Sequence, residues 1–472
     1  MTPSPSSPAS TLDAPLSARE TGPAGFGPAD SAPAPVSVPV PGPAPETGRG
    51  GRFARLPLIA GRGFIPLGLF ARLPLAMLTV GALTLVTAVT GSYAVGGAAA
   101  GAVGIGSALG APVLGVLADR LGQRSVLLVS ASANTAAVVA LILAAYMVSG
   151  VQDLAAAAPA LAAAFIAGAS CPQVGPLARV RWMALTARTP EGGGRAGAGS
   201  ADLDTALSYE STADELTFVL GPALVGVLAS LLAPWLPLAL AAALTLVLVP
   251  AFAVHPTHHA VARAPRRRAA KPGARQPDAR ALSRRIGARA AVALPVLAMV
   301  CMGTFFGSTQ TSLSSFSAGF ATSELAGLLY AVMGLSSAAA ALSVAYWSPR
   351  FRLNARWLAC AALMAGLAVL LPMPSTALPM VLVLLILGLP VGPLMVTVFA
   401  IGGLVAPAGK LGTVMTALAS GIVAGTALGS SIAGQLAQTF GYQTAFLVPV
   451  CAATALFLLG TAAAVVLRRR AG

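Results

Sequence analysis

Residues 115–124 read GVLADRLGQR and separate two long apolar segments. One apolar run ends just before this stretch and the next begins at residue 125, so the stretch has room only for a tight turn. Aspartate and arginine each cost about 2.5–3.5 kcal/mol at the centre of a membrane-spanning helix. Asp119, Arg120 and Arg124 are therefore predicted to lie at a membrane surface, where Gly115 and Gly122 let the backbone bend and neighbouring helices approach.

The composition agrees with a membrane protein. Hydrophobic residues make up 56% of the 472 residues and charged residues 9%, and the mean hydropathy is +0.82. A water-soluble fold cannot hide so much apolar surface with so few charges, so a polytopic membrane protein is predicted. The net charge of +15 comes from basic residues that flank apolar runs, which favours membrane topology over nucleic-acid binding. The four cysteines lack metal-like spacing and are interpreted as buried thiols.

The pattern G-x-L-A-D-R-x-G-x-R resembles the signature loop between helices 2 and 3 of the major facilitator superfamily of transporters. The matching positions are Gly115, Leu117, Ala118, Asp119, Arg120, Gly122 and Arg124. Gln123 departs from the pattern, because the family more often has a basic residue there. The resemblance implies an all-α polytopic membrane protein with twelve transmembrane helices in two six-helix halves. It also implies a gate in which Asp119 faces the start of span 11, near Lys410 and Gly412, and latches the outward-open state.

Twelve apolar runs support this count, because each has about 17–23 residues and can cross about 30 Å of hydrocarbon as a helix. In the first half of the chain they cover about 73–91, 94–114, 126–148, 155–177, 212–232 and 235–254. In the second half they cover about 292–312, 325–346, 357–373, 376–398, 411–433 and 445–467. Spans 4 and 10 share a helix-softening sequence, with Gly168, Pro172 and Pro176 in one and Gly388, Pro390 and Pro393 in the other.

The basic residues predict the orientation of these spans. With the first end inside, the cytoplasmic segments are 1–66, 115–125, 178–211, 255–291, 347–356, 399–410 and 468–472. All 29 Lys and Arg lie in or beside these segments, whereas the predicted outer loops hold only the acids Asp153 and Glu324. The positive-inside rule therefore predicts a multi-pass protein of the cytoplasmic membrane with both termini cytoplasmic.

Five segments follow from this topology. They are a disordered cytoplasmic tail (1–66), an N-terminal six-helix half (67–254), a basic cytoplasmic linker (255–291), a C-terminal six-helix half (292–467) and a cytoplasmic C-terminus (468–472). The linker is interpreted as a solvated segment near anionic lipid heads, with a nucleic-acid or calmodulin-type site as the alternative. Its three histidines, His255, His258 and His259, are too loosely arranged to predict a metal site.

Glycines four residues apart mark spans 2 and 11. They are Gly97, Gly101, Gly106 and Gly110 in span 2, and Gly421, Gly425 and Gly429 in span 11. Small residues at this spacing let helix backbones touch. Because the resemblance implies that helix 2 packs on helix 11, the glycines predict a sliding surface between the halves, with ordinary helix packing as the alternative. Gly221 and Pro222 in span 5 loosely resemble a pattern of the superfamily's antiporters and are further packing candidates.

Three acids at the start of span 5, Glu210, Asp214 and Glu215, are the candidates for proton coupling. Glu210 and Asp214 share a helix face because they are four residues apart, and Glu215 is turned away by about 100°. Acids near a span interior are costly and usually mark proton or ion paths. The alternatives are a set of structural ion pairs at the cytoplasmic surface and direct contact with the substrate. The cationic candidates for these pairs are Arg120, Arg124, Arg179 and Arg181, the last two at the predicted end of span 4.

The substrate cavity is less clearly marked. The candidates are Asn134, Gln173, Thr309, Gln310 and Tyr330, which are polar side chains inside apolar runs. Such residues also hold helices together, so helix packing is the alternative for each of them. No fixed binding charge is evident deep in the spans, so the expected substrate is an uncharged, lipophilic or cationic small molecule.

The sequence thus predicts a secondary active transporter that works by alternating access, with proton-coupled export by antiport as the leading hypothesis. No ATP-binding loop is present, so an ion gradient is expected to drive transport. The alternatives are a narrow-substrate importer of a metabolite and a non-transporting sensor or scaffold. An enzyme is not expected, nor are a metal, another cofactor or a nucleic-acid partner. The expected partners are the substrate, protons and the lipid bilayer, around a monomeric protein.

Overall fold

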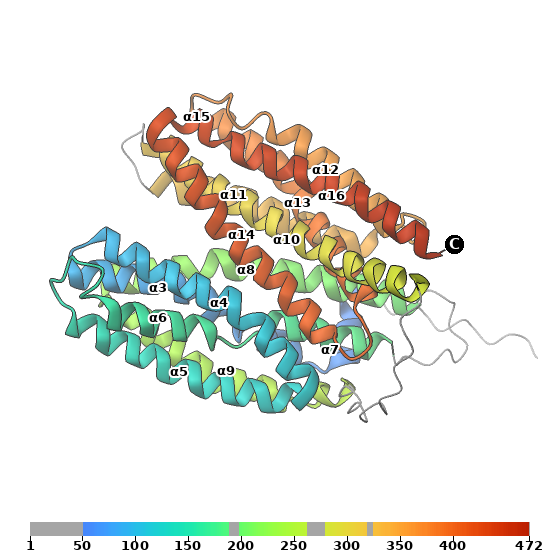
Figure 1. Cartoon of the computed structure of the whole chain (residues 1–472), viewed down its shortest axis with the longest axis horizontal. Coiled ribbons are helices and arrows are strands. Elements are labelled where there is room, and N and C mark those ends of the chain that lie inside the picture. Colours follow the sequence, from blue (N-terminus) through green and yellow to red (C-terminus); the bar gives the residue numbers. More distant parts are fainter. Residues whose placement is uncertain (1–50, 188–197, 262–278, 319–323, 472) are drawn as a thin grey trace, which may run out of the picture. The chain divides into compact units, whose positions relative to one another are not determined.

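Helices form every regular element in the described residues, which are 51–187, 198–261, 279–318 and 324–471 (Figure 1). In this computed structural model, residues 49–472 form one compact unit. The expected tail up to residue 50 and the centre of the expected basic linker, 262–278, lie outside the described residues. The C-terminal segment 468–472 is described only as the last backbone turn of a helix, up to residue 471.

The first half of the chain begins with a short 3-10 helix, η1 (Arg52–Arg55). The helices that follow are α1 (Leu56–Ala60), α2 (Phe64–Phe70), α3 (Leu73–Thr90), α4 (Tyr93–Leu121), α5 (Gln123–Met147), α6 (Ala158–Ala169), α7 (Val174–Thr186), α8 (Ala198–Leu231), α9 (Leu236–Val254) and η2 (Pro256–Ala260). We call these elements the N-terminal half.

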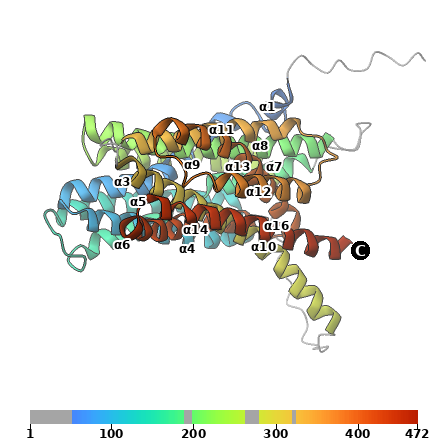
Figure 2. The ribbon, with the colours of Figure 1, turned by 90° about the horizontal axis from the view of Figure 1, so that it is seen from above.

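The second half contains α10 (Ala279–Ala318), α11 (Glu324–Ser343), η3 (Val344–Tyr346), α12 (Leu353–Ala368), α13 (Ala377–Val405), α14 (Leu411–Phe440), α15 (Tyr442–Ala445) and α16 (Leu447–Ala471). We call these elements the C-terminal half. In Figure 2 the first turns of α10 project beyond the ends of the neighbouring helices.

Eleven helical stretches of the described chain are long and apolar enough to cross a membrane, and α12 adds a shorter apolar helix. Two of the stretches contain an interruption: α2 and α3 form Phe64–Thr90, and α6 and α7 form Ala158–Thr186. In hydrocarbon a helix satisfies its own backbone hydrogen bonds, so apolar runs of this length fold in this way. The predicted all-α fold with twelve transmembrane helices in two halves is confirmed.

Local signals explain how successive spans begin and end. α3 stops at Gly91, which has a φ of 73°. Ser92 then caps α4, because its side chain accepts a hydrogen bond from the Val95 amide. Gly122, with a φ of 94°, makes the turn between α4 and α5. The tight turn predicted from residues 115–124 therefore depends on a glycine conformation that side chains rarely adopt.

Several predicted boundaries are wrong, and the errors concentrate where charged residues lie inside helices. The tail was expected to be disordered to residue 66, but Leu56, Ala60 and Phe64 are buried in a common apolar cluster. α10 starts at 279, within the expected linker. Span 4 continues through α7 to residue 186, and span 5 starts at 198 rather than 212. A scan for apolar runs misses the added turns of α7 and α8, where Arg179 pairs with Asp214 and Asp204 pairs with Arg356 inside the protein.

The glycine stripes pack helices within each half, not across the halves. An added Cβ at Gly106 or Gly110 would lie about 2 Å from backbone oxygens of α6. Similarly, one at Gly425 or Gly429 would lie about 2 Å from backbone oxygens of α10. The expectation that these stripes form the sliding surface between halves is therefore wrong. Gly97 and Gly101 have nothing within 4 Å of an added Cβ.

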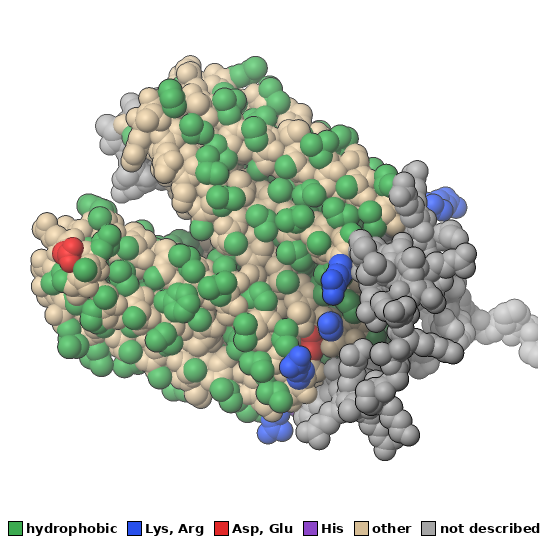
Figure 3. All heavy atoms as spheres, viewed as in Figure 1, with side chains coloured by type: hydrophobic (Ala, Val, Ile, Leu, Met, Phe, Trp, Pro, Cys, Tyr) green, Lys and Arg blue, Asp and Glu red, His purple; other side chains and the backbone are tan. Residues whose placement is uncertain are grey.

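The two halves meet most extensively along two helix pairs, α4 with α14 and α8 with α11. One end of these pairs carries four exposed basic residues, at the end of α4, at the start of α5 and in the segments before α12 and α14, and we call it the basic end. They are Arg120, Arg124, Arg350 and Lys410. Figure 3 shows a hollow between the halves at the opposite end, while its exposed Lys and Arg side chains gather toward the basic end. Among the described residues, the halves are therefore separated at the end opposite the basic end.

Candidate functional site

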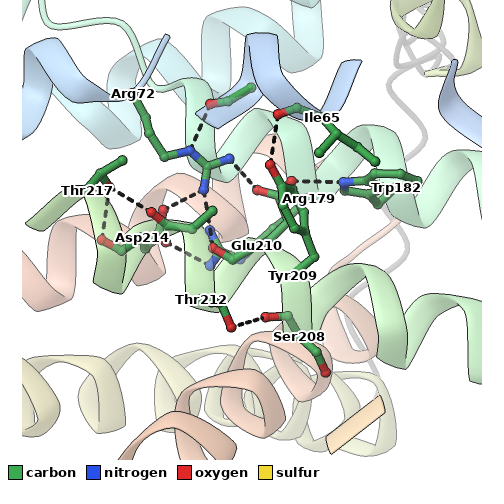
Figure 4. A network of polar contacts seen from close by, with 12 residues as sticks. Ile65, Arg72, Arg179, Trp182, Ser208, Tyr209, Glu210, Thr212, Asp214 and Thr217 are labelled. Carbon is green, nitrogen blue, oxygen red and sulfur yellow. Dashed lines mark hydrogen bonds and ion pairs between the residues drawn. The ribbon is translucent and has the colours of Figure 1, made fainter. Parts of the chain in front are cut away.

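A buried group of four charged side chains lies where α3, α7 and α8 meet (Figure 4). Arg72 is the residue that precedes α3, Arg179 lies on α7, and Glu210 and Asp214 lie one turn apart on α8. We call these four residues the charge cluster. Two arginines and two carboxylates balance in formal charge, which is the condition under which such groups can be buried.

Glu210 is held from two sides. Its Oε2 accepts a hydrogen bond from Arg72 Nη2 at 2.6 Å, and its Oε1 accepts one from Trp182 Nε1 at 2.8 Å. The Glu210 side chain is 1% exposed. Arg72 is fully engaged as well, because its Nε donates to the Gly68 carbonyl at 3.0 Å. Arg72 and Glu210 therefore form a fixed pair inside the N-terminal half.

Asp214 bridges the two arginines. Its Oδ1 accepts from Arg72 Nη1 and its Oδ2 accepts from Arg179 Nη2, both at 2.8 Å. The Asp214 side chain is 18% exposed, in contrast to the 1% of Arg179. Asp214 is therefore the member of the charge cluster that is most open to its surroundings.

The cluster lies beside a break in span 4. Helix α6 ends at Ala169 and α7 starts at Val174, so residues 170–173, which include Pro172, are not helical. An added Cβ at Gly175, in the first turn of α7, would lie 3.2 Å from Asp214 Oδ1 and 3.6 Å from Arg179 Nη1. The first turn of a half-helix, which carries a partial positive charge, thus lies close to the Asp214 carboxylate in the middle of a span.

Glu215 lies in a different environment from its neighbour. The side chain is buried, points to α11 in the C-terminal half, and accepts a hydrogen bond from Ser337 Oγ at 2.9 Å. No described cation forms an ion pair with it, whereas Glu210 and Asp214 both pair with arginine. Of the three predicted proton-coupling candidates, two are therefore members of the charge cluster and one lies between the halves.

At the basic end, Asp119 binds the N-terminus of α14. Its Oδ1 accepts from the Gly412 amide at 2.8 Å, and its Oδ2 accepts from the Thr413 amide at 2.7 Å and the Thr413 hydroxyl at 2.6 Å. Gly115, one turn earlier on α4, lets the Thr416 hydroxyl approach to 1.9 Å from where a Cβ would be. The predicted approach of Asp119 to Gly412 is present, and Lys410 is the N-cap residue of α14.

Further contacts join the halves toward the same end. Arg356 Nη1 binds Asp204 Oδ2 at 3.1 Å, and Thr212 Oγ1 donates to the Ala338 carbonyl at 3.1 Å. The guanidinium of Arg179 lies 4.0 Å from the centre of the Phe399 ring on α13. This cation–π contact links the charge cluster to the C-terminal half.

The predicted cavity residues are spread over α5, the break before α7, α10 and α11. Asn134 Nδ2 donates to the Ala167 carbonyl at 2.6 Å, and Gln173 Nε2 donates to the Cys171 carbonyl at 2.9 Å, so both are used inside the N-terminal half. Thr309 is buried, Gln310 is exposed and Tyr330 is half-buried on α11. Gly221 approaches Ala76 of α3, with an added Cβ 2.7 Å from the Ala76 side chain, and Pro222 lies inside α8.

Sequence reasoning did not find four residues that shape the site, namely Arg72, Trp182, Arg356 and Phe399. Arg72 and Arg356 were counted as basic residues flanking spans, and Arg179 and Arg181 were expected at a membrane surface. Arg179 and Arg181 are instead buried, and Arg181 donates to Gln123 Oε1 at 2.9 Å and to the Phe252 carbonyl at 2.7 Å. One feature of the sequence could have indicated Trp182. Arg179 and Trp182 are three residues apart on α7 and so lie on one helix face. Within the described residues, no group of three or more His, Cys, Asp or Glu could hold a metal ion.

Comparison with known proteins agrees with this architecture. The human organic anion transporter MFSD10 (TETRAN) is similar in structure, with a TM-score of 0.60 at 20% identity over 87% of this chain and 100% of that one. The E. coli fucose:proton symporter FucP gives 0.56 at 15% identity over 84% of this chain and 98% of that one. A bacterial homologue of the iron transporter ferroportin gives 0.59 at 14% identity over 85% and 98%.

At these identities the structural likeness shows the fold alone, and no curated protein matches the chain. The family assignment comes from the sequence, because the family model of the Major Facilitator Superfamily matches residues 64–421, well over half of the chain. The twelve-helix architecture, the two halves and the Asp119 contact with α14 are consistent with that match. The chain therefore belongs to the Major Facilitator Superfamily and is a multi-pass membrane transporter.

Proposed function

We propose that this protein is a proton-coupled transporter of a small organic molecule and that Glu215 carries the coupling proton. The observation that supports this proposal is the unpaired burial of Glu215 between the halves. A buried carboxylate without a cation is costly in its charged form, and binding a proton removes that cost.

The other described acids have partners or solvent. Glu210 and Asp214 bind arginines, Asp204 binds Arg356, and Asp202 binds Arg55 at 3.1 Å. Asp119 accepts hydrogen bonds from backbone amides, and Asp153 is exposed. Among the described side chains, Glu215 is the buried acid that lacks a cation or backbone amides as partners. Protonation would neutralise its charge.

The position of Glu215 suits a coupling role. Ser337 is on the other half, so any separation of α8 from α11 removes the hydrogen bond and changes the solvation of the carboxylate. A group that binds its proton more tightly in one conformation than in the other links proton binding to the conformational equilibrium. One charge that moves through 100 mV supplies about 2.3 kcal/mol, which corresponds to roughly a 50-fold concentration gradient.

Alternating access supplies the transport step in this proposal. By the positive-inside rule the basic end faces the cytoplasm, so the hollow in Figure 3 faces outward and the Asp119 contact closes the inner side. Opening inward requires breaking that contact and the Arg179–Phe399 contact. Export remains the proposed direction, with a monomer in the cytoplasmic membrane as the working unit.

The expected substrate class needs revision. A lipophilic or cationic compound was expected because no fixed charge was evident deep in the spans. Arg72 and Arg179 are buried in spans 1 and 4, which removes that premise. We therefore propose a small organic molecule as the substrate, without specifying the sign of its charge.

Infrared difference spectroscopy of the protein in lipid bilayers, recorded as the pH is varied, tests the proton site without a known substrate. Wild type should show a carboxyl band that titrates, and Glu215→Gln should lose it. The control Asp153→Asn alters an exposed acid and should keep the band. A band that persists in Glu215→Gln would refute the role of Glu215.

A flux assay tests coupling and direction. Inside-out vesicles are given dyes of positive, negative and neutral charge, with and without a protonophore. Proton-coupled export is supported if the protonophore abolishes uptake in wild type and if uptake is also lost in Glu215→Gln. Protonophore-sensitive uptake that is unchanged in Glu215→Gln would contradict the assigned residue, and flux found only in right-side-out vesicles would reverse the direction.

A further inference from the structure

The break in span 4 places a half-helix N-terminus against the charge cluster. Helix α7 has 13 residues and no side chain that caps its N-terminus. Its first turn carries Gly175, whose missing side chain lets the Asp214 carboxylate and the Arg179 guanidinium lie close to the backbone. An anion is stabilised at such a position by the partial positive charge of the helix end.

Arg179 adds an unused donor at this position. The residue is 1% exposed, its Nη2 binds Asp214, and its Nε is buried with no hydrogen-bond partner in the protein. A buried donor without an acceptor is costly, so an acceptor that reached this N–H would gain a hydrogen bond that the protein does not supply. The planar guanidinium presents its donors in a fork that matches a carboxylate.

We propose that Arg179, the N-terminus of α7 and the neighbouring Arg72 form the binding site for the anionic group of an organic monoanion substrate, and that the Asp214 carboxylate occupies this site when substrate is absent. This inference rests on the proposed function, because it names the substrate class of the transporter. The class is an organic carboxylate or sulfonate whose apolar part lies beside Phe399.

Asp214 is suited to leave the site. The Asp214 side chain is 18% exposed, and two guanidinium groups bind its carboxylate oxygens. The Glu210 side chain is 1% exposed, and both Arg72 and Trp182 bind it. Asp214 is therefore the more accessible of the two acids. When a substrate anion displaces Asp214, the Arg72–Glu210 pair stays neutral and Arg179 keeps an anionic partner. The charge balance of the buried residues is thereby preserved.

The site also lies where the substrate can affect both halves. Arg179 belongs to the N-terminal half, and the Phe399 ring that covers its guanidinium at 4.0 Å belongs to the C-terminal half. A ligand that binds Arg179 differently when Phe399 is close and when it is distant shifts the equilibrium between the two conformations.

The test measures binding of benzoate to the full-length protein in lipid nanodiscs, from the rise in unfolding temperature with benzoate concentration. Benzylammonium, of similar shape and opposite charge, is the matched ligand control. Wild type should bind benzoate weakly, because Asp214 competes. Asp214→Asn removes that competitor and should lower the apparent Kd about ten-fold or more, while Asp153→Asn, at an exposed acid, should not change it.

Loss of Arg179 gives the complementary result. Arg179→Gln in the Asp214→Asn background should abolish benzoate binding, and Arg179→Lys in that background should restore part of it. The gain expected for Asp214→Asn cannot come from misfolding, so the test does not depend on the Arg179 variants folding well. Benzylammonium binding as tight as benzoate, or no tightening in Asp214→Asn, would overturn the assignment.

The outcome is independent of the proton site. Benzoate binding that follows these expectations while the infrared band persists in Glu215→Gln would retain the substrate class and refute the proton carrier. The converse pair of results would retain proton coupling and refute the anion site.

Discussion

Asp119 caps a helix of the opposite half, because its carboxylate accepts the amides of Gly412 at 2.8 Å and Thr413 at 2.7 Å at the first turn of α14. A carboxylate at a helix N-terminus gains both hydrogen bonds and a favourable interaction with the helix dipole. The gain exists only while α4 and α14 are close at the basic end. The Asp119–Gly412 contact therefore stabilises the arrangement in which α4 and α14 are close at the basic end.

Removing this cap should open the basic end. Asp119→Ala should disfavour the closed basic end by about 0.5–2 kcal/mol, the usual loss on deleting a helix cap. The measurement is the distance distribution between spin labels at residues 125 and 408, both exposed at this end, in a background in which the exposed Cys451 is replaced by serine. Asp153→Asn is the control, and a distribution unchanged in Asp119→Ala would show that the cap does not set this equilibrium.

The glycine stripes yield a matched pair of variants. In Gly425→Ala the new Cβ would lie 2.0 Å from the Val300 carbonyl oxygen, so α14 and α10 must separate. Overpacking of this kind costs about 1–3 kcal/mol, and the unfolding temperature of the purified protein should fall. Gly97→Ala introduces the same methyl group where nothing lies within 4 Å, and should leave the unfolding temperature unchanged or raise it. Equal effects in both variants would contradict backbone contact between these helices.

The Arg72–Glu210 pair should behave as a buried ion pair. Glu210→Gln weakens the partner of Arg72 and of the Trp182 indole, so stability should fall by about 3–5 kcal/mol. The double variant Arg72→Met/Glu210→Met removes both buried charges and should recover part of that loss. Denaturant unfolding of the three proteins measures the difference. A double variant less stable than Glu210→Gln would mean that Arg72 is also required by Asp214.

Stability should depend weakly on pH through His255, which lies just outside the spans. Burial and the positive charge of Arg181 lower the pKa of His255 below its ordinary value of about 6.5. The folded protein thus favours the neutral imidazole, and the stabilisation is present above the ordinary pKa and is lost as the pH falls toward the lowered one. Unfolding temperatures measured from neutral to mildly acidic pH should fall less steeply in His255→Asn than in wild type. His259→Asn, at an exposed histidine, is the control.

The sequence was sufficient for the fold because the relevant signals are local. Apolar run length predicts a spanning helix, and the Asp119 motif predicts a turn at a membrane surface, since both follow from the cost of placing charge in hydrocarbon. The same rule failed for Arg72, Arg179 and Arg181, which are buried. Their cost is offset by partners on other helices, and such pairing is not visible in an apolar scan.

The candidate site was predicted only in part, for a related reason. Glu210 and Asp214 were placed on one face of a helix from their spacing, and the structure agrees. The rotation of α8 against α3, α7 and α11 determines which of these acids pairs with an arginine. Glu215 differs from Asp214 by one residue, yet it faces the other half of the protein. That distinction requires the three-dimensional arrangement of the helices.

The backbone-to-backbone packing at Gly106, Gly110, Gly425 and Gly429 has a mechanical consequence. Helices pressed together with about 2 Å between a would-be methyl and a carbonyl oxygen cannot slide past each other without a steric collision. α4 must therefore carry α6 with it, and α14 must carry α10, whenever the contact between the halves changes. In the alternating-access step proposed above, each of these two helix pairs would then move as one rigid body.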